Sequence, residues 1–589
     1  MIVNKFRNAL FSLALRKLIK ILTVQERKDF YKILILTTFG VFLEMASIVM
    51  ILPVMSLLTG GRTTIRIPGL QPALDYLQNL APEKALVIEI SALLVVVLVK
   101  NAYQAWIAYK QSAFGYRVQA RISNQLFENY LSQPFQYHLH HNSATLIRNC
   151  TQEPNQVNQF VIMPGFTIIS EAFLVLGVAF LLIFLQPYFT LVNGVLMGSA
   201  FMIFNRLTSC RILSWGYQRL SAESHRIQLI QQSLGAIKDV KLRRSEKFFL
   251  SEYSNYNKET SRVGHLQNAL QQMPRLFLEV LLYAGLLALV VLTVVLNSNI
   301  SNLVSALGLF AAAVYKILPS ANKISTSYQS MKFSMPSMDN FLQELNLEKE
   351  RFADQTDKQP LTFFSSIAID HITYTYEGGN HSVLNNVSLT IKKGECIGLH
   401  GESGSGKSTL INIVLGLLPP QQGSVSVDGI DIAANITSWN KKLGYVPQSI
   451  YLIDDSIRRN IAFGLPDHQI DDEAVNAALE KAHLRNFVSS LPEGFNTFVG
   501  ERGVRLSGGQ IQRIGIARAL YHNPEVLILD EATSALDYST ESSIMEAIET
   551  LYGMKTILII AHRLSTLEKC DRLYKLDKGN LILESDKKN

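Results

Sequence analysis

Apolar residues are unevenly distributed along the 589-residue chain. The first half contains long apolar stretches, whereas the second half alternates short apolar and polar runs. A hydrocarbon core of ~30 Å requires about 20 residues of helix. Six stretches are long enough, or nearly so, and are predicted to be membrane spans near residues 33–58, 85–108, 159–185, 188–206, 276–296 and 302–325.

The connections between these spans differ in length and charge. Gln186-Pro187 separates spans three and four, and Asn297-Ser298-Asn299 joins spans five and six. The connections after spans two and four are long, basic and poor in Gly and Pro. Because cytoplasmic loops are enriched in Lys and Arg, the long connections are predicted to be cytoplasmic and helical, with both termini in the cytoplasm.

Two further segments are amphipathic. Residues 4–23 interleave basic and apolar positions, which indicates a helix on the cytoplasmic membrane surface or a helix that packs within the protein. Residues 68–84 show a short helical apolar pattern. This external segment is expected either to touch the outer leaflet or a lipid-borne substrate, or to pack on its own helices.

Beyond the last span, residues 336–360 are charged and poor in apolar residues, which predicts a linker. Strand-like runs then alternate with helical ones, as in an α/β domain with a central sheet. The predicted fold is therefore multidomain: an all-α six-helix transmembrane domain (1–335), a linker (336–360) and an α/β nucleotide-binding domain (361–589).

Composition supports a membrane domain joined to a soluble one. Mean hydropathy is +0.16 and only 17% of residues are charged. The net charge of +7 does not indicate nucleic-acid binding, because the first-half Lys and Arg cluster between apolar spans. The four cysteines (Cys150, Cys210, Cys396 and Cys570) are far apart in sequence and show no zinc-ligand spacing.

A phosphate-binding loop follows the predicted strand at 396–399 and precedes a helical run. It fits G-x-x-x-x-G-K-S, and its residues are Gly401, Glu402, Ser403, Gly404, Ser405, Gly406, Lys407 and Ser408, followed by Thr409. Its glycines allow backbone N–H groups to surround phosphates. Lys407 is expected to contact the β- and γ-phosphates of ATP, and Ser408 to ligate Mg²⁺.

A second apolar strand, at 526–529, ends in two acids. Asp530 is predicted to hold Mg²⁺, and Glu531 to polarise the attacking water. Adjacent acids at a strand end are usually solvated. The phosphate-binding loop in the same domain favours the catalytic interpretation.

The pentapeptide Leu506-Ser507-Gly508-Gly509-Gln510 resembles the signature of ATP-binding-cassette (ABC) proteins. Ser507 and the glycine amides at a helix N-terminus form a second anion site, suited to a γ-phosphate. As in that family, it is expected to close over ATP held by another subunit. The resemblance therefore implies a homodimer, with a heterodimer as the alternative.

The resemblance assigns roles to further residues. By position in the family's motifs, Tyr376 stacks on adenine, Gln448 links the Mg²⁺ and γ-phosphate site to the membrane domain, Asp537 crosses the dimer interface, and His562 contacts the γ-phosphate. Gly500-Glu501-Arg502-Gly503 resembles the loop with which exporters contact coupling helices. Since the set is complete, the chain is expected to hydrolyse ATP with Mg²⁺.

Three cations lie in or beside the spans: Lys100, Arg275 and Lys316. Charges in lipid are costly, so each is expected to face a cavity or a partner. Arg275 has Glu279 four residues away as an alternative partner, and Lys100 can extend toward the membrane interface. Together the three are predicted to bind a phosphate or pyrophosphate head group.

The runs 314–322 and 273–276, with the intramembrane Glu44, resemble the bacterial flippases of lipid-linked oligosaccharides (PglK type). This resemblance implies a polyprenyl-pyrophosphate-linked oligosaccharide as substrate, membrane lipids as partners, and the bacterial inner membrane as location. Two of the three cations are Lys where the resemblance predicts Arg, which removes the bidentate fork.

Two other functions compete with this flippase. One is an exporter of lipid A-like lipids or hydrophobic drugs, although a cavity for cationic drugs should be acidic or aromatic. The other is an ATP-gated channel or regulatory protein, which the complete catalytic set disfavours.

Overall fold

The protein is described by a computed structural model that covers residues 16–50, 82–185, 187–295, 300–345, 347, 361–376, 378–379, 381–531, 538–561 and 563–587. The chain divides into two compact units. The first comprises residues 1–133 and 141–349, and the second comprises residues 134–140 and 350–589.

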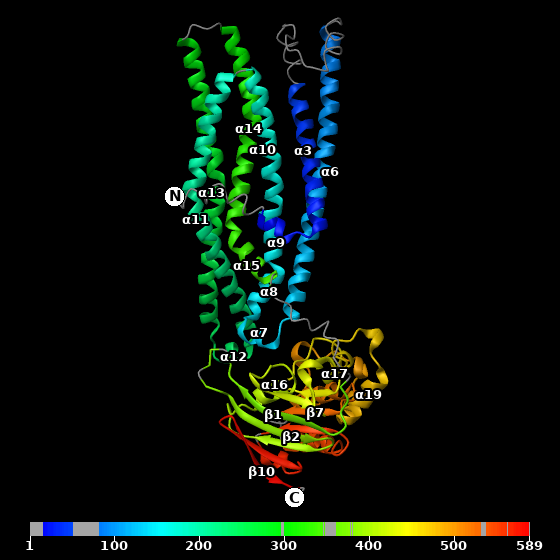
Figure 1. Ribbon diagram of the computed structural model, residues 1–589. Helices are drawn as coiled ribbons and strands as arrows, with labels where there is room; N and C mark the ends of the chain where they lie inside the picture. Colours follow the sequence, from blue (N-terminus) through cyan, green and yellow to red (C-terminus); the bar gives the residue numbers. More distant parts are fainter. Residues whose placement is uncertain are drawn as a thin grey trace. The chain divides into compact units, whose positions relative to one another are not determined.

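Long helices build the first unit, and each overlaps one of the six predicted spans (Figure 1). Residues 51–58 of the first predicted span and residue 296 of the fifth lie outside the described residues. They are α3 (Val24–Val49), α6 (Pro82–Leu131), α10 (Met163–Leu185), α11 (Pro187–Gly235), α13 (Glu246–Val295) and α14 (Ile300–Phe333). Because α6 has 50 residues, it is about 75 Å long and exceeds a ~30 Å hydrocarbon core. The predicted helical extension of the long connections is therefore confirmed.

Length and composition also fit membrane insertion. Within the described residues, the stretches Val24–Ser47, Glu83–Leu131 and Ser143–Phe180 are long and apolar enough to cross a membrane. Helix α11 packs against α13, α10 against α14, and α3 against α6. Phe30, Phe114 and Phe166 form a buried aromatic cluster where α3, α6 and α10 meet.

Short helices complete this unit: α8 (Ser143–Thr151), α9 (Glu153–Val157), a π-helical turn (Asn158–Ile162), α12 (Ile237–Leu242) and α15 (Met335–Leu345). The linker predicted at 336–360 is wrong over residues 336–345, which belong to α15. Met335, Met338 and Phe341 are buried at helical spacing, and α15 packs on α6 and α11. Its charge content concealed this apolar face.

The amphipathic segments are described only in part. In the segment 16–22, Leu18, Ile21 and Leu22 are buried, and Lys17 forms an ion pair with Asp339 of α15. This portion therefore packs within the unit. Residues 4–15 and 68–81 lie outside the described residues.

The second unit is an α/β domain with two sheets. The six-stranded sheet has the order β10-β9-β3-β8-β7-β6, and the four-stranded sheet has the order β2-β1-β4-β5. The strands are β1 (Ser366–Tyr374), β2 (Leu384–Lys392), β3 (Cys396–His400), β4 (Gln422–Val427), β5 (Ile430–Asp431), β6 (Leu443–Val446), β7 (Val526–Asp530), β8 (Thr556–Ile560), β9 (Arg572–Asp577) and β10 (Asn580–Asp586).

The six-stranded sheet positions the site. Strands β3, β6, β7, β8 and β9 are parallel, and every residue of β7 and β8 is buried. Burial on both faces explains their continuous apolar sequence. The carboxyl ends of parallel strands share one edge, where α/β proteins bind ligands. Strands β3 and β7 therefore deliver the phosphate-binding loop and the two acids to the same edge.

Helices surround these sheets: α7 (Phe135–His140), α16 (Lys407–Val414), α17 (Ile436–Asn440), α18 (Ile457–Ile461), α19 (Asp472–Lys481), α20 (Arg485–Ser489), α21 (Gly508–Leu520), α22 (Tyr538–Glu549) and α23 (Leu564–Leu567). Cys396 and Cys570, far apart in sequence, bring their Sγ atoms to 3.2 Å in the core. Their spacing in the sequence does not predict this proximity.

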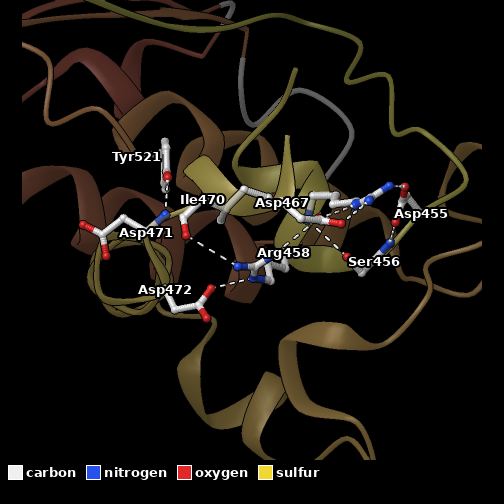
Figure 2. Close-up of polar contacts among 9 residues, drawn as sticks. Asp455, Ser456, Arg458, Asp467, Ile470, Asp471, Asp472 and Tyr521 are labelled. Carbon is white, nitrogen blue, oxygen red and sulfur yellow. Dashed lines mark hydrogen bonds and ion pairs between the residues drawn. The ribbon is translucent and has the colours of Figure 1, made fainter. Parts of the chain in front are cut away.

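An ion-pair network fixes the segment around α18 (Figure 2). Arg458 bonds Asp472 at the start of α19 and lies 3.5 Å from Asp467. Asp471 caps α19, and its backbone N–H donates to the Tyr521 hydroxyl at 2.9 Å. The network ties the chain that follows Gln448 to α19 and α21.

Candidate nucleotide-binding site

The phosphate-binding loop has the backbone that an anion requires. Helix α16 begins after Gly406, whose φ of 108° is left-handed, and no side chain caps its first N–H groups. A Cβ at Gly406 would lie 2.8 Å from the Val383 carbonyl oxygen, so glycine is required there. The uncapped N–H groups are available to a phosphate.

Lys407 lies inside this loop. It is 5% exposed, and its Nζ donates to the carbonyl oxygens of Gly401 and Glu402 at 2.8 and 2.9 Å. These bonds hold the ammonium group where the predicted β- and γ-phosphates would bind. Ser408 and Thr409 follow on α16.

The structure brings the predicted base and its partner together. The Gln448 amide Nε2 donates to Glu531 Oε2 at 2.5 Å. Glu531 has a left-handed φ of 49°, an uncommon conformation that marks a constrained position. Its backbone N–H donates to the Ile560 carbonyl oxygen at 2.9 Å, which fixes this turn to β8.

Asp530 is buried beside Glu531. Burial raises the pKa of the Asp530 carboxyl, Glu531 adds to this shift, and Lys407 opposes it. Asp530, Ser408 and Gln448 offer carboxylate, hydroxyl and amide oxygens, which are the hard donors that Mg²⁺ prefers. The residues present therefore fit the cation.

Tyr376, predicted to stack on adenine, lies near the N-terminus of α16. Its hydroxyl is 3.1 Å from Thr409 Oγ1, and its ring makes an edge contact with Tyr374 at a centroid distance of 5.1 Å. This places an aromatic ring beside the N-terminus of α16.

The signature residues lie at the start of α21. Ser507 caps α21 through a capping box with Gln510: Ser507 Oγ accepts from the Gln510 N–H, and Gln510 Oε1 accepts from the Ser507 N–H. Ser507 is exposed. Within the described residues, no hydrogen bond or ion pair joins Ser507–Gln510 to the phosphate-binding loop. Asp537 and His562 lie outside the described residues.

Sequence reasoning missed two features of this unit. Tyr445, three residues before Gln448, pairs with Ile528 of β7 and so lies on the strand beside Asp530; only the strand register reveals this. Helix α7 belongs to the second unit, and Phe135 packs on its core. Pro134 and Phe135 help line a cleft of about 370 Å³ with Leu415 and Ile436. The Gln133-Pro134 break was the available signal.

Of the three predicted cations, Lys100 has an acidic neighbour on α3. Lys100 Nζ lies 3.2 Å from Glu44 Oε2, and Gln104 Nε2 donates to the same oxygen at 2.6 Å. Glu44 is buried and Lys100 is nearly so, with side chains 7% and 11% exposed. Lys100 is therefore compensated within the chain.

Arg275 on α13 is exposed, and within the described residues no ion pair joins it to Glu279. Gln271 of α13 donates to Ser330 of α14 at 3.0 Å. The two helices run antiparallel. Arg275, four residues after Gln271 on α13, is therefore level with residue 326 on α14, four residues before Ser330. Lys316 lies ten residues further along, or about 15 Å; its side chain lies outside the described residues.

Comparison with known proteins agrees with this architecture. Residues 1–315 match the ABC transporter transmembrane region, and residues 384–534 match the ABC transporter family. An ATP-dependent lipid A-core flippase of Ralstonia nicotianae is 30% identical over 498 residues (83% of this chain, 82% of the relative). That of Cupriavidus metallidurans is 31% identical over 507 residues (84% and 83%).

A solved structure shows the same fold. The structure of a bacterial Atm1-family ABC exporter with ATP bound aligns with a TM-score of 0.77 and 21% identity, covering 96% of this chain and 95% of that one. Helical membrane region, parallel sheet and phosphate-binding loop together define a membrane transporter with a nucleotide-binding domain. The chain belongs to the ABC transporter family. It is an exporter-type ATPase whose ATP hydrolysis is coupled to transport.

Proposed function

We propose that the chain is an ATP-driven flippase that moves a polyprenyl-pyrophosphate-linked oligosaccharide from the inner to the outer leaflet of the bacterial inner membrane. The observation that carries the proposal is Arg275, an exposed guanidinium at the edge of a predicted span. Arg binds phosphate groups with two parallel hydrogen bonds, so this position suits a pyrophosphate. Lys316, further along the neighbouring helix, suits a head group that moves along the helices.

Lipid A-like glycolipids are the second candidate substrate. The two relatives described above are named as lipid A-core flippases. Both candidates are glycolipids with an anionic head group, and Arg275 serves either. Lys100 does not distinguish them, because Glu44 compensates its charge.

The proposed catalytic unit is a homodimer. Ser507 is exposed at the N-terminus of α21, and its capping box leaves the Gly508 and Gly509 N–H groups available to a phosphate. Each ATP would lie between the phosphate-binding loop of one subunit and the signature of its partner. In each site Ser408, Gln448 and Asp530 would hold Mg²⁺, which neutralises charge on the phosphates.

Glu531 would act as general base toward the attacking water, with Gln448 fixing its carboxylate. Asp537 and His562 are proposed to complete the site, at the dimer interface and the γ-phosphate. Both termini are proposed to be cytoplasmic, because the basic connections lie on that side.

Proteoliposome translocation tests the substrate. A labelled polyprenyl-pyrophosphate oligosaccharide and a labelled lipid A are offered separately with ATP, with Glu531→Gln as the inactive control. Movement of the first alone supports the proposal. Movement of lipid A alone establishes the second candidate. ATP hydrolysis that moves neither refutes both.

A further inference from the structure

Three backbone segments of the second unit meet at the phosphate-binding loop. They are the loop itself at Ser405 and Gly406, the chain at Val383 just before β2, and the turn between β9 and β10, whose central residues are Lys578 and Gly579. The segments are far apart in the chain. They come together because β9 pairs with β3, which leads into the loop, and β10 packs against β2.

Gly579 forms backbone hydrogen bonds in two directions. Its N–H donates to the Ser405 carbonyl oxygen at 3.3 Å, and its carbonyl oxygen accepts from the Asn385 N–H at 2.8 Å. The Asn385 side chain adds a bond to the same turn, because its Nδ2 donates to the Lys578 carbonyl oxygen at 3.3 Å. Gly579 therefore connects the phosphate-binding loop to the start of β2.

The start of β2 follows the segment that carries Tyr376, the residue predicted to stack on adenine. The Val383 N–H donates to the Tyr374 carbonyl oxygen at 2.8 Å, two residues before Tyr376. The connection through Gly579 thus joins the segment predicted to hold the adenine ring to the loop predicted to hold the phosphates.

Glycine is required on both sides of this junction. Gly579 has a left-handed φ of 82°, and a Cβ there would lie 2.7 Å from the Val383 carbonyl oxygen. A Cβ at Gly406 would lie 2.8 Å from the same oxygen. A side chain at residue 579 must therefore displace either its own turn, which bonds Ser405, or Val383, which packs on Gly406. Either movement reaches the phosphate-binding loop.

We propose that Gly579 is a positioning residue for nucleotide binding: its backbone holds the phosphate-binding loop in the shape that accepts ATP and ties it to the segment of Tyr376. A loop that is ordered before binding loses less freedom when the phosphates bind. The inference rests on ATP binding at this loop, but not on the identity of the transported lipid.

The turn between β4 and β5 provides a matched control. Its central residues, Asp428 and Gly429, have φ values of 49° and 81°, and those of Lys578 and Gly579 are 45° and 82°. A Cβ at Gly429 would meet no atom within 4 Å. Alanine therefore imposes a similar backbone strain in both turns, but only at residue 579 does it disturb the phosphate-binding loop.

Nucleotide affinity tests this role. The full-length protein in detergent is titrated with a fluorescent ATP analogue in the presence of Mg²⁺. A loop that keeps its binding shape for about a tenth of the time binds about tenfold more weakly. Gly579→Ala is expected to weaken binding by about this factor, whereas Gly429→Ala should change it less than about twofold. Both should lower the thermal midpoint, because they share the backbone strain.

Steady-state kinetics give a second readout. For Gly579→Ala, the KM for ATP should rise about tenfold, while kcat falls less than about threefold because Glu531 and Gln448 are unchanged. A merely structural turn would lower the thermal midpoint without raising the KM.

A milder pair of variants avoids backbone strain. Asn385→Ala removes an exposed side chain that bonds the turn, and it should weaken analogue binding about threefold at an unchanged thermal midpoint. Ser388→Ala is its control. Ser388 is exposed on the same strand, and its hydroxyl accepts from the His371 N–H at 3.0 Å, so its loss should leave binding unchanged.

The outcomes separate the inference from the nucleotide site itself. Lys407→Ala should abolish analogue binding; if it does not, the assignment of the nucleotide site fails. If Lys407→Ala abolishes binding but Gly579→Ala and Gly429→Ala bind equally well, the positioning role of Gly579 is refuted and the site stands. Should Gly579→Ala not fold, equal binding by Asn385→Ala and Ser388→Ala refutes the role instead.

Discussion

The buried pair of Lys100 and Glu44 separates a structural cation from a substrate-binding one. The charges are 3.2 Å apart, with side chains 11% and 7% exposed. At an effective dielectric constant of ~20, their Coulomb attraction is about 5 kcal/mol, most of which offsets their desolvation. Lys100→Met removes a cation that lies 3.2 Å from the buried Glu44 carboxylate. Lys100→Met is therefore expected to destabilise the protein by about 3–5 kcal/mol.

The measurement is the midpoint of thermal denaturation of the purified protein in detergent. Lys100→Met should lower it strongly, and Glu44→Gln should lower it less, because Gln still accepts the hydrogen bond from Gln104. The double variant should recover most of the loss, since neither charge remains. Lys110→Met is the matched control: Lys110 is exposed on the same helix and lies over the Trp106 ring at 5.7 Å.

Transport distinguishes the two roles. If Lys100 acts through Glu44, transport recovers with stability in the double variant. The reasoning is refuted if Lys100→Met keeps its thermal midpoint but loses transport, and the double variant stays inactive. Lys100 would then contact the substrate, as first predicted from the sequence.

Other substitutions test the nucleotide site and the membrane cavity. Glu531→Gln should retain ATP binding but reduce turnover by at least ~100-fold, measured by phosphate release. Ser507→Asp keeps the cap of α21 but places a negative charge at the predicted γ-phosphate site, so ATPase should be lost at an unchanged thermal midpoint; Ser507→Ala should lower stability by about 1 kcal/mol. Gly406→Ala should abolish binding of a fluorescent ATP analogue, because its Cβ meets the Val383 carbonyl oxygen; Gly429→Ala, with a similar positive φ and open space, should not. Arg275→Ala should abolish glycolipid movement with basal ATPase retained, and Arg275→Lys should restore part of it; equal transport by all three proteins would exclude Arg275 from the substrate site.

Local sequence determined the fold class and most of the nucleotide site. Continuous apolar stretches predict spanning helices because a backbone in lipid must satisfy its own hydrogen bonds. The phosphate-binding loop and the acids at 530–531 are recognisable because each depends on a few consecutive residues at a strand end. Position in a motif also identified Gln448 and Ser507, although not what they contact.

Tertiary structure alone decided the partners. Gln448 reaches Glu531 because β6 lies beside β7, and the register of these strands also sets Tyr445 opposite Ile528. Lys100 is paired because α3 packs on α6 with Glu44 at the same height. Such contacts join residues far apart in the chain, and strand register and helix packing select them. A single sequence shows which residues are charged, but only the packed structure shows which charges are already compensated.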